Sequence, residues 1–161
     1  LRPLTDTLPK CLMPIAGKPL LEIWLEAFWA DGIDRVLVNT HYLPDEVVSF
    51  VKGSRFASGV RLVHEAELLG TGGTLLANQD AFWDGPILVA HADNLTRFSP
   101  KAFLAAHSER PDGTDMTMMT FRTPDPGSCG ILELDSRGVV RAFHEKVKNP
   151  PGNLANAAVY V

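Results

Sequence analysis

The 161-residue sequence has few cysteines, no long apolar run and no excess of basic charge. Its two cysteines, Cys11 and Cys129, match no metal-binding or redox spacing, which is typical of buried thiols in a reducing compartment. No stretch reaches about 20 apolar residues, and the first residues lack the pattern of a secretory signal. We therefore expect a cytoplasmic protein that does not associate with a membrane.

Basic residues are too few, and too scattered, for a general nucleic-acid binder. The chain carries 15 Lys and Arg against 19 Asp and Glu, with a net charge of −4, whereas a duplex binder needs a basic face. Any site for a polyanion must therefore be local. The length and the hydrophobic fraction of 45% predict one globular domain with a substantial core.

Strands and helices alternate through the first two thirds of the sequence. Expected strands cover residues 35–39, 60–64 and 86–90, and expected helices cover residues 20–30, 45–51, 74–80 and 100–108. Short apolar runs followed by segments of helical spacing are typical of strand–helix units. The alternation predicts an α/β fold with a mostly parallel sheet and right-handed crossovers. Trp24, Trp29 and Trp83 are expected in the core.

The alternation of strands and helices ends in the last third of the sequence, where strands follow one another without helices. Expected strands cover residues 116–121, 130–134, 139–144 and 157–161. Residues 135–138, with the sequence Asp-Ser-Arg-Gly, favour a tight turn between two of them. This pattern predicts an antiparallel hairpin appended to the α/β core.

The opening segment, residues 1–19, combines three cations with four prolines. The cations are Arg2, Lys10 and Lys18, and the prolines are Pro3, Pro9, Pro14 and Pro19. Proline fixes φ near −65° and disfavours helix in the preceding residue, so we expect the segment to be held extended as a preformed anion-binding loop. The alternative is a solvated basic loop.

The residues of the opening carry a more specific signal. The string L-R-P-L-T-x-x-x-P-K-x-L-x-P-I-x-G-K-P-L-L resembles the opening of the sugar-1-phosphate nucleotidyltransferases, the enzymes that make nucleotide sugars. In that family a glycine-rich loop and an arginine precede the residue that is Leu1 here, and a second metal-binding aspartate is expected after Tyr160. The resemblance implies a Rossmann-like three-layer sandwich without its first strand. It also implies a single nucleotidyltransferase domain over residues 1–161, truncated at both ends.

Asp93 follows a fully apolar predicted strand. Ligands of open parallel sheets bind outside the carboxyl ends of the strands, and Mg²⁺ takes one or two carboxylates together with phosphate oxygens. The other interpretation of Asp93 is a cap in the following loop. The resemblance implies that Asp93 is the catalytic, metal-binding aspartate, with Ala92 in place of the usual glycine.

The predicted nucleotide site lies around a glycine cluster. Gly70-Thr71-Gly72-Gly73, with Glu65 upstream, resembles the nucleobase loop E-x-x-L-G-T-A-G of the family. A tight turn leading into a helix at Thr74 is the alternative. The resemblance also implies that Lys10 is catalytic and binds the triphosphate and that Leu1 and Arg2 belong to the nucleotide site. Arg2 and Lys18 are more typical of residues that support the loop.

The predicted sugar-phosphate site comes from the last third of the chain. Glu145-Lys146 resembles the family's Glu-Lys-Pro, with Val147 in place of proline. Asn156 lies in a segment that resembles N-x-x-N-A-G-I-Y, where Ala158 replaces glycine, and Gly130 resembles the glycine whose backbone faces the sugar. The resemblance implies that Gly130, Glu145, Lys146 and Asn156 bind the sugar phosphate.

The resulting expectation is nucleotidyl transfer from a nucleoside triphosphate to a sugar 1-phosphate, with Mg²⁺ as cofactor. The strings H-E-A-E-L-L-G-T-G-G-T and N-A-A-V-Y are most similar to the mannose-1-phosphate guanylyltransferase branch, which favours GTP and mannose 1-phosphate, although uridylyl and thymidylyl branches share most of these residues. Two alternatives remain: a nucleotide or sugar-phosphate binding module without turnover, and a metal-dependent hydrolase that uses His41, His64 and His91. The sequence leaves the oligomeric state open, a homo-oligomer included.

Overall fold

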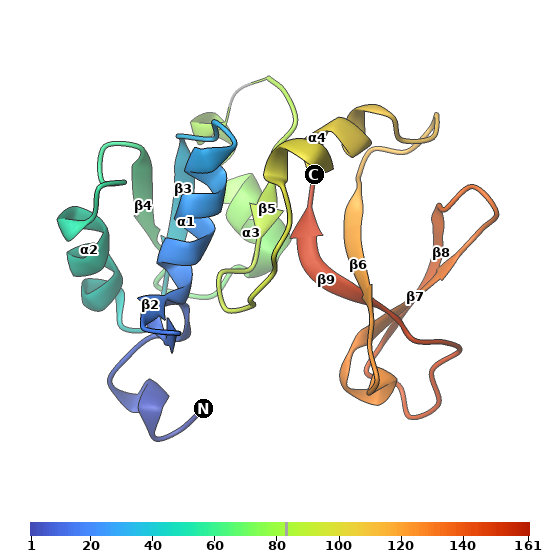
Figure 1. Cartoon of the computed structure of the whole chain (residues 1–161), viewed down its shortest axis with the longest axis horizontal. Helices are drawn as coiled ribbons and strands as arrows, with labels where there is room; N and C mark the ends of the chain where they lie inside the picture. Colours follow the sequence, from blue (N-terminus) through green and yellow to red (C-terminus); the bar gives the residue numbers. More distant parts are fainter. Residues whose placement is uncertain (83) are drawn as a thin grey trace. The chain divides into compact units, whose positions relative to one another are not determined.

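The computed structural model of the chain describes residues 1–82 and 84–161, so the core position expected for Trp83 lies outside the described residues. Contacts divide the chain into two compact units. Unit 1 consists of Leu1–Gly85 and Ala92–Leu95, and unit 2 consists of Pro86–His91 and Thr96–Val161. Each unit contains both helices and strands (Figure 1).

The opening segment folds into short turns and a small hairpin. Its elements are η1 (Leu4–Asp6), η2 (Lys10–Leu12), β1 (Pro14–Ile15) and β2 (Lys18–Pro19), with β1 antiparallel to β2. The prediction that the prolines hold the segment extended is therefore correct at Pro9, Pro14 and Pro19 and wrong at Pro3. A φ near −65° suits a 3₁₀ turn as well as an extended chain, and Pro3 has φ −83° and ψ −6°.

The rest of unit 1 is a strand–helix arrangement. Its elements are α1 (Leu20–Ala30), β3 (Val36–Thr40), α2 (Pro44–Gly53), β4 (Val60–His64), α3 (Gly70–Ala77) and η3 (Gln79–Ala81). Strands β3 and β4 pair in parallel, from Val36 opposite Val60 to Thr40 opposite His64. This confirms the predicted strand–helix–strand order.

The hydrophobic core of unit 1 forms where α1 and α2 bury their apolar faces. Its buried members are Leu12, Leu21, Leu25, Val47, Val51 and Phe56. Trp24 is 4% exposed, and Trp29 packs against this cluster, so both lie in the core as predicted. Leu12 joins the cluster from η2 and thereby fixes the turn that carries Lys10.

Unit 2 is built on an antiparallel sheet. Its elements are β5 (Val89–Ala90), α4 (Pro100–Ser108), β6 (Met118–Arg122), η4 (Pro126–Ser128), β7 (Gly130–Leu134), β8 (Val140–Glu145) and β9 (Leu154–Tyr160). The strand order is β5-β9-β7-β8, and β6 also pairs with β9. The predicted hairpin β7–β8 is confirmed, and its turn closes with a bond from the Asp135 N–H to the Val139 carbonyl.

The α/β class is confirmed, with a different balance of pairings from the expected one. Among the described residues, parallel pairing occurs between β3 and β4, whereas the sheet of unit 2 is antiparallel. The strand expected over residues 86–90 is reduced to β5, which pairs with β9 at the end of the chain. The helix α4 follows β5 as it would in a parallel unit, so local sequence could not indicate this long-range partner.

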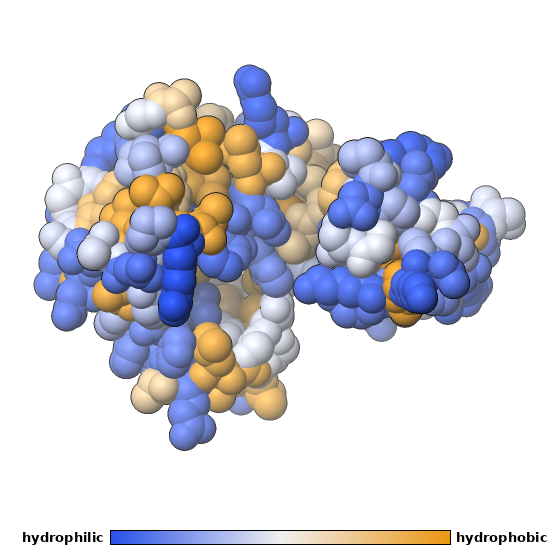
Figure 2. Space-filling model, turned by 90° about the horizontal axis from the view of Figure 1, so that it is seen from below, coloured by the Kyte–Doolittle hydropathy of each residue, from blue (hydrophilic) through white to orange (hydrophobic). Residues whose placement is uncertain are grey.

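Within the described chain, the longest apolar helices fall short of the length needed to cross a bilayer. On the face shown in Figure 2, hydrophobic residues form separate patches among hydrophilic ones.

Candidate active site

Lys10 and Asp93 come together in unit 1 from distant parts of the sequence. Lys10 Nζ lies 3.8 Å from Asp93 Oδ2. The two side chains are 60% and 46% exposed, and an ion pair between exposed groups contributes at most about 1 kcal/mol. The pair is therefore open to solvent and easily exchanged for another charged partner, such as a phosphate for Lys10 or a cation for Asp93.

The turn that carries Asp93 is fastened to α1. Trp24 Nε1 donates a hydrogen bond of 2.8 Å to the carbonyl of Asn94, the residue after Asp93. On the other side of Asp93, Ala92 packs against the core of unit 1. Ala92 is not among the residues with positive φ, so alanine fits the backbone where the resemblance expects glycine.

Cys11 lies beside Lys10 in η2. Burial, with a smaller effect of the nearby Asp93 charge, raises the pKa of the Cys11 thiol to about 11. The thiol is therefore protonated at neutral pH and is a poor nucleophile. Both Cys11 and Cys129 are free, in agreement with the expectation from their spacing.

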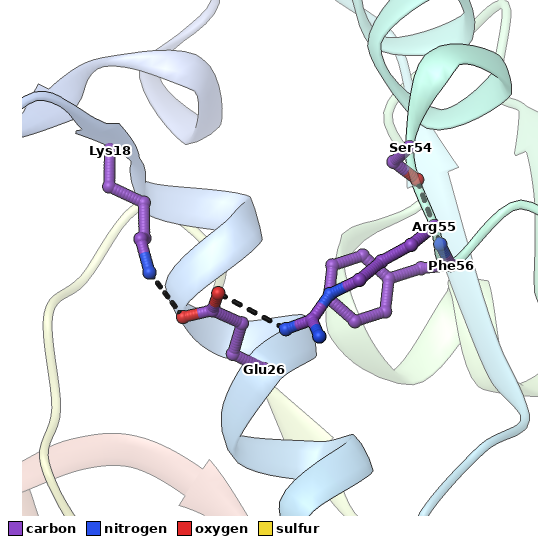
Figure 3. A network of polar contacts seen from close by, with 5 residues as sticks. All are labelled: Lys18, Glu26, Ser54, Arg55 and Phe56. Carbon is purple, nitrogen blue, oxygen red and sulfur yellow. Dashed lines mark hydrogen bonds and ion pairs between the residues drawn. The ribbon is translucent and has the colours of Figure 1, made fainter.

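The other cations of the opening segment have acidic partners. Lys18 Nζ lies 2.6 Å from Glu26 Oε2, and Arg55 Nη2 lies 3.2 Å from Glu26 Oε1, so Glu26 joins the β2 turn to the end of α2 (Figure 3). The hydrogen bond from Lys18 is the main reason why the pKa of Glu26 is lowered. Arg2 is 88% exposed and pairs with Asp6 at 3.4 Å. Lys18 thus supports the loop, as its position in the sequence suggested.

The glycine cluster lies inside a helix and not in a loop. The sequence placed residues 65–73 in a loop, but Gly70 begins α3 with φ +71°, and Gly73 ends its first turn. Because these residues are small, no bulky side chain covers the backbone of the first turn of α3. Gly70, Thr71 and Gly72 are exposed.

Glu65 is buried beneath this helical turn, with 5% exposure. Its carboxylate accepts hydrogen bonds from the Leu69 N–H at 3.4 Å and from Thr74 Oγ1 at 2.5 Å. The carbonyl of Glu65 is 2.8 Å from His41 Nδ1. Glu65 therefore holds the start of α3 in place, and its contacts are with the protein itself.

Three of the four predicted sugar-phosphate residues share one face of the unit 2 sheet. Gly130 on β7 lies opposite Glu145 on β8, and Ile131 lies opposite Ala155 on β9. Because antiparallel partners run in opposite directions, the second pairing places Asn156 next to Gly130. Glu145, Gly130 and Asn156 thus form a row across three neighbouring strands, which we call the β7 row.

Lys146 and Asn156 are each held in place by hydrogen bonds to neighbouring residues. Lys146 has φ +49°, its N–H donates to the Cys129 carbonyl, and its Nζ lies 3.6 Å from Glu145 Oε1. Asn156 Nδ2 donates to Tyr160 Oη, and its Oδ1 accepts from the N–H of Ala158, at 2.7 and 2.8 Å. Among the residues that the structure describes, these are the side-chain partners of Asn156, so its second amide proton and second lone pair can bond a ligand.

The metal-hydrolase alternative finds no support. Among the described residues, no group of three or more His, Cys, Asp or Glu side chains is arranged to hold a metal ion. Asp93 offers a single carboxylate, which suits Mg²⁺ when phosphate oxygens complete the shell.

Comparison with known proteins decides the family. The family model for "Nucleotidyl transferase" matches residues 1–161. The chain belongs to the nucleotidyl transferase family. Similar proteins include mannose-1-phosphate guanylyltransferase 1 of Arabidopsis thaliana at 32% identity, and the glucose-1-phosphate thymidylyltransferase of Streptomyces griseus at 35%, each over the whole chain. The chain spans about half the length of these relatives, 46% and 45%.

The chain shares the Rossmann-like fold of two solved structures. HddC from Yersinia pseudotuberculosis complexed with GMP-PN has a TM-score of 0.80 and 23% identity, over 99% of this chain and 69% of that one. A putative glucose-1-phosphate thymidylyltransferase from Bacillus anthracis, in complex with a sucrose, has a TM-score of 0.81 and 21% identity, over 99% of this chain and 65% of that one. This confirms the predicted fold.

Sequence reasoning missed three residues of the candidate site. Trp24 fastens the Asp93 turn, Thr74 bonds Glu65, and Phe143 lies over Gly130. Phe143 had a usable signal, because strand alternation places it on the same face as Glu145. The roles of Trp24 and Thr74 depend on contacts that no local pattern contains.

Proposed function

We propose that the protein transfers a nucleotidyl group from a nucleoside triphosphate to a sugar 1-phosphate and releases pyrophosphate. The observation that carries the proposal is that Lys10 Nζ and Asp93 Oδ2 lie 3.8 Å apart on two exposed turns. A phosphate chain bound there can contact the Lys10 ammonium. Relatives named mannose-1-phosphate guanylyltransferase, from Arabidopsis thaliana and Mycobacterium tuberculosis, favour GTP and mannose 1-phosphate. A thymidylyltransferase of similar identity makes dTTP with glucose 1-phosphate the next pair to test.

The reaction needs positioning and neutralisation of charge, with no covalent step on the protein. A phosphate oxygen of the sugar 1-phosphate attacks the α-phosphorus of the triphosphate. The bond from that phosphorus to the oxygen that bridges it to the β-phosphate breaks, and pyrophosphate leaves with the electron pair. Lys10 contacts the triphosphate and the charge that develops on it, where a preorganised cation typically contributes about 10² to 10³ in rate.

Asp93 is the residue proposed to hold Mg²⁺. Its carboxylate is exposed, lies beside an exchangeable cation and is fixed through its neighbour Asn94. Bound Mg²⁺ would supply positive charge to the phosphate oxygens. Asp93 would then hold the metal at a fixed position relative to Lys10. Both residues are anchored to the core of unit 1, Asp93 through Ala92 and Lys10 through Leu12.

The nucleotide is proposed to bind at the start of α3. Gly70, Thr71, Gly72 and Gly73 present backbone close to the ligand without bulky side chains, and Glu65 acts by holding this turn. Leu1 and Arg2, both strongly exposed, complete the proposed nucleotide contacts.

The sugar phosphate is proposed to bind on the β7 row. Glu145 accepts hydrogen bonds from sugar hydroxyls, Asn156 offers its remaining amide proton, and Lys146 faces the phosphate. Gly130 has no side chain and so leaves room on this face for the Phe143 ring beside Glu145. We also propose a cytoplasmic location and no nucleic-acid partner, supported by the two free thiols and the net charge of −4.

The test is pyrophosphate release with Mg²⁺. GTP, dTTP, UTP, ATP and CTP are each combined with mannose, glucose and N-acetylglucosamine 1-phosphates. We expect turnover with one dominant pair, GTP with mannose 1-phosphate. Turnover with another pair corrects the substrates, whereas nucleotide binding without turnover by any pair replaces the enzyme with a binding module.

Two substitutions test the proposed site. Lys10→Met should lower kcat/KM by about 10² to 10³, while Lys52→Met, at an exposed position of α2, should leave it within twofold. Asp93→Asn should raise the Mg²⁺ concentration required for half-maximal rate, and Asp34→Asn, at another exposed position, should not. Equal effects of the site and control variants would contradict the assignment.

A further inference from the structure

Phe143 lies on the same sheet face as the β7 row. Residues two apart on a strand point to the same side, so Phe143 and Glu145 share a face of β8. Phe143 lies opposite Leu132 in the ladder, two residues along from the pair of Gly130 with Glu145. The side chain of Leu132 is 4% exposed, whereas Phe143 is 46% exposed.

The Phe143 ring leans over Gly130 into the middle of the β7 row. A Cβ atom built on Gly130 would overlap the end of the Phe143 ring and would lie 2.8 Å from Glu145 Oε2. The ring, the carboxylate and the glycine backbone are therefore in direct proximity. Lys146 follows with its ammonium 3.6 Å from the same carboxylate.

The Phe143 ring, the Glu145 carboxylate and the Lys146 ammonium together match the surface of a hexose phosphate. A pyranose ring has apolar patches of C–H groups on its faces and hydroxyl groups around its rim, and small-molecule sites combine apolar and aromatic walls with a few polar groups that fix orientation. Here an exposed aromatic ring is bordered by a carboxylate for hydroxyl groups and by an ammonium for a phosphate. Phe143 is 46% exposed, so its ring is accessible to a ligand at this position.

We propose that Phe143 is the platform on which the sugar ring of the sugar 1-phosphate packs, and that it contributes to selection of the sugar. The proposal rests on the function proposed above. In this arrangement the C–H groups of the sugar lie against Phe143, a hydroxyl donates to Glu145, and the phosphate lies near Lys146. The competing role is structural, because an aromatic ring over a strand glycine protects the ladder without any ligand.

Steady-state kinetics of the intact protein separate the two roles. Phe143→Leu keeps an apolar side chain and removes the aromatic ring. We expect the KM of the sugar 1-phosphate to rise about five- to tenfold, from the usual strength of contacts with an aromatic ring, with kcat and the KM of the nucleotide within twofold. Phe121→Leu is the matched control, because Phe121 is 44% exposed and pairs with Ala155, on the opposite face from Gly130.

A second variant keeps the test valid if Phe143→Leu folds poorly. Phe143→Trp preserves an aromatic platform, so the KM of the sugar phosphate should stay within about threefold of the original, and its fluorescence should change on saturation with the sugar phosphate more than that of the unsubstituted protein. A KM that is unchanged in Phe143→Leu, or that rises equally for both substrates, overturns the platform. Absence of turnover in the unsubstituted protein would instead contradict the proposed function itself.

Discussion

Ala158 has a left-handed backbone, with φ +55°, although it carries a Cβ atom. It interrupts β9 between Asn156, whose Oδ1 bonds the Ala158 N–H, and the pairing of Val159 with Ala90. The left-handed region costs a residue with a Cβ atom about 1–2 kcal/mol, and glycine avoids this cost but loses more chain entropy on folding. Ala158→Gly should therefore raise the free energy of unfolding by about 0.5–1 kcal/mol in urea titrations.

The neighbouring alanine provides the control for this prediction. Ala157 lies in the same strand and is not among the residues with positive φ. Ala157→Gly should lower the free energy of unfolding by about 0.5–1 kcal/mol, because glycine in a strand interior adds only the entropy cost. The same sign for both substitutions would show that the backbone of Ala158 is not strained.

His107 couples the stability of unit 2 to pH. It is buried, with Nδ1 2.9 Å from Thr117 Oγ1, and burial, followed by the charge of Arg110, lowers its pKa below the ordinary value of 6.5. As the pH falls below about 6.5, the unfolded chain binds a proton that the folded protein does not, so the free energy of unfolding falls. His107→Gln should reduce the loss of stability between pH 7.5 and pH 5.5.

Urea midpoints at these two pH values measure the effect as a difference, so that any constant cost of the substitution cancels. His64→Gln, at an exposed position of β4, serves as the control and should retain the original pH dependence. An undiminished loss of stability in His107→Gln would mean that His107 is protonated in the folded protein as well.

At the scale of elements, the Asp93 turn depends on a helix that carries none of the predicted site residues. The indole of Trp24 in α1 donates to the Asn94 carbonyl, and a single hydrogen bond of this kind contributes about 0.5–1.5 kcal/mol. Trp24→Phe removes the donor and keeps an aromatic ring in the core. We expect the Mg²⁺ concentration for half-maximal rate to rise about threefold or more, with little change in the KM of the sugar phosphate.

Trp29→Phe is the corresponding control on the same helix. Trp29 packs against Phe56 with ring centroids 5.0 Å apart, and its loss of volume should lower stability without a specific change in Mg²⁺ dependence. A parallel shift of Mg²⁺ dependence in both variants would mean that Trp24 acts through the stability of α1 and not through the turn.

Elements governed by local pattern were predictable, and those governed by long-range partners were not. Strand β4 and helix α4 begin and end where the sequence placed them, because apolar spacing and Pro100 define them locally. Helix α3 starts four residues earlier than Thr74, since Glu65 bonds both Leu69, the residue before the helix, and Thr74 within it. Strand β9 begins at Leu154, three residues before the predicted start, because β6 supplies partners as far as that residue.

At the scale of the whole molecule, motif order predicted which side chains share a site better than composition did. Lys10 and Asp93 were assigned to one reaction from the family resemblance, and the fold places them together. The burial of Glu65 and the half-exposed ring of Phe143 follow from packing between segments, which a single sequence does not encode in any short window. Resemblance thus indicated candidate positions for a site, and the structure distinguishes the exposed residues among them from the buried ones.

Burial also predicts how substitutions distribute over the chain. Leu25 is 0% exposed in the core of unit 1, Val159 is 0% exposed on β9, and Leu76 of α3 is 71% exposed. Removal of buried carbons leaves a cavity, so Leu25→Ala should cost about 2–5 kcal/mol and Val159→Ala about 1–3 kcal/mol of unfolding free energy, whereas Leu76→Ala should stay within about 0.5 kcal/mol. Urea unfolding with hydrogen exchange measures all three. A cost for Leu76→Ala as large as that for Leu25→Ala would show that α3 packs its apolar face against a partner in solution.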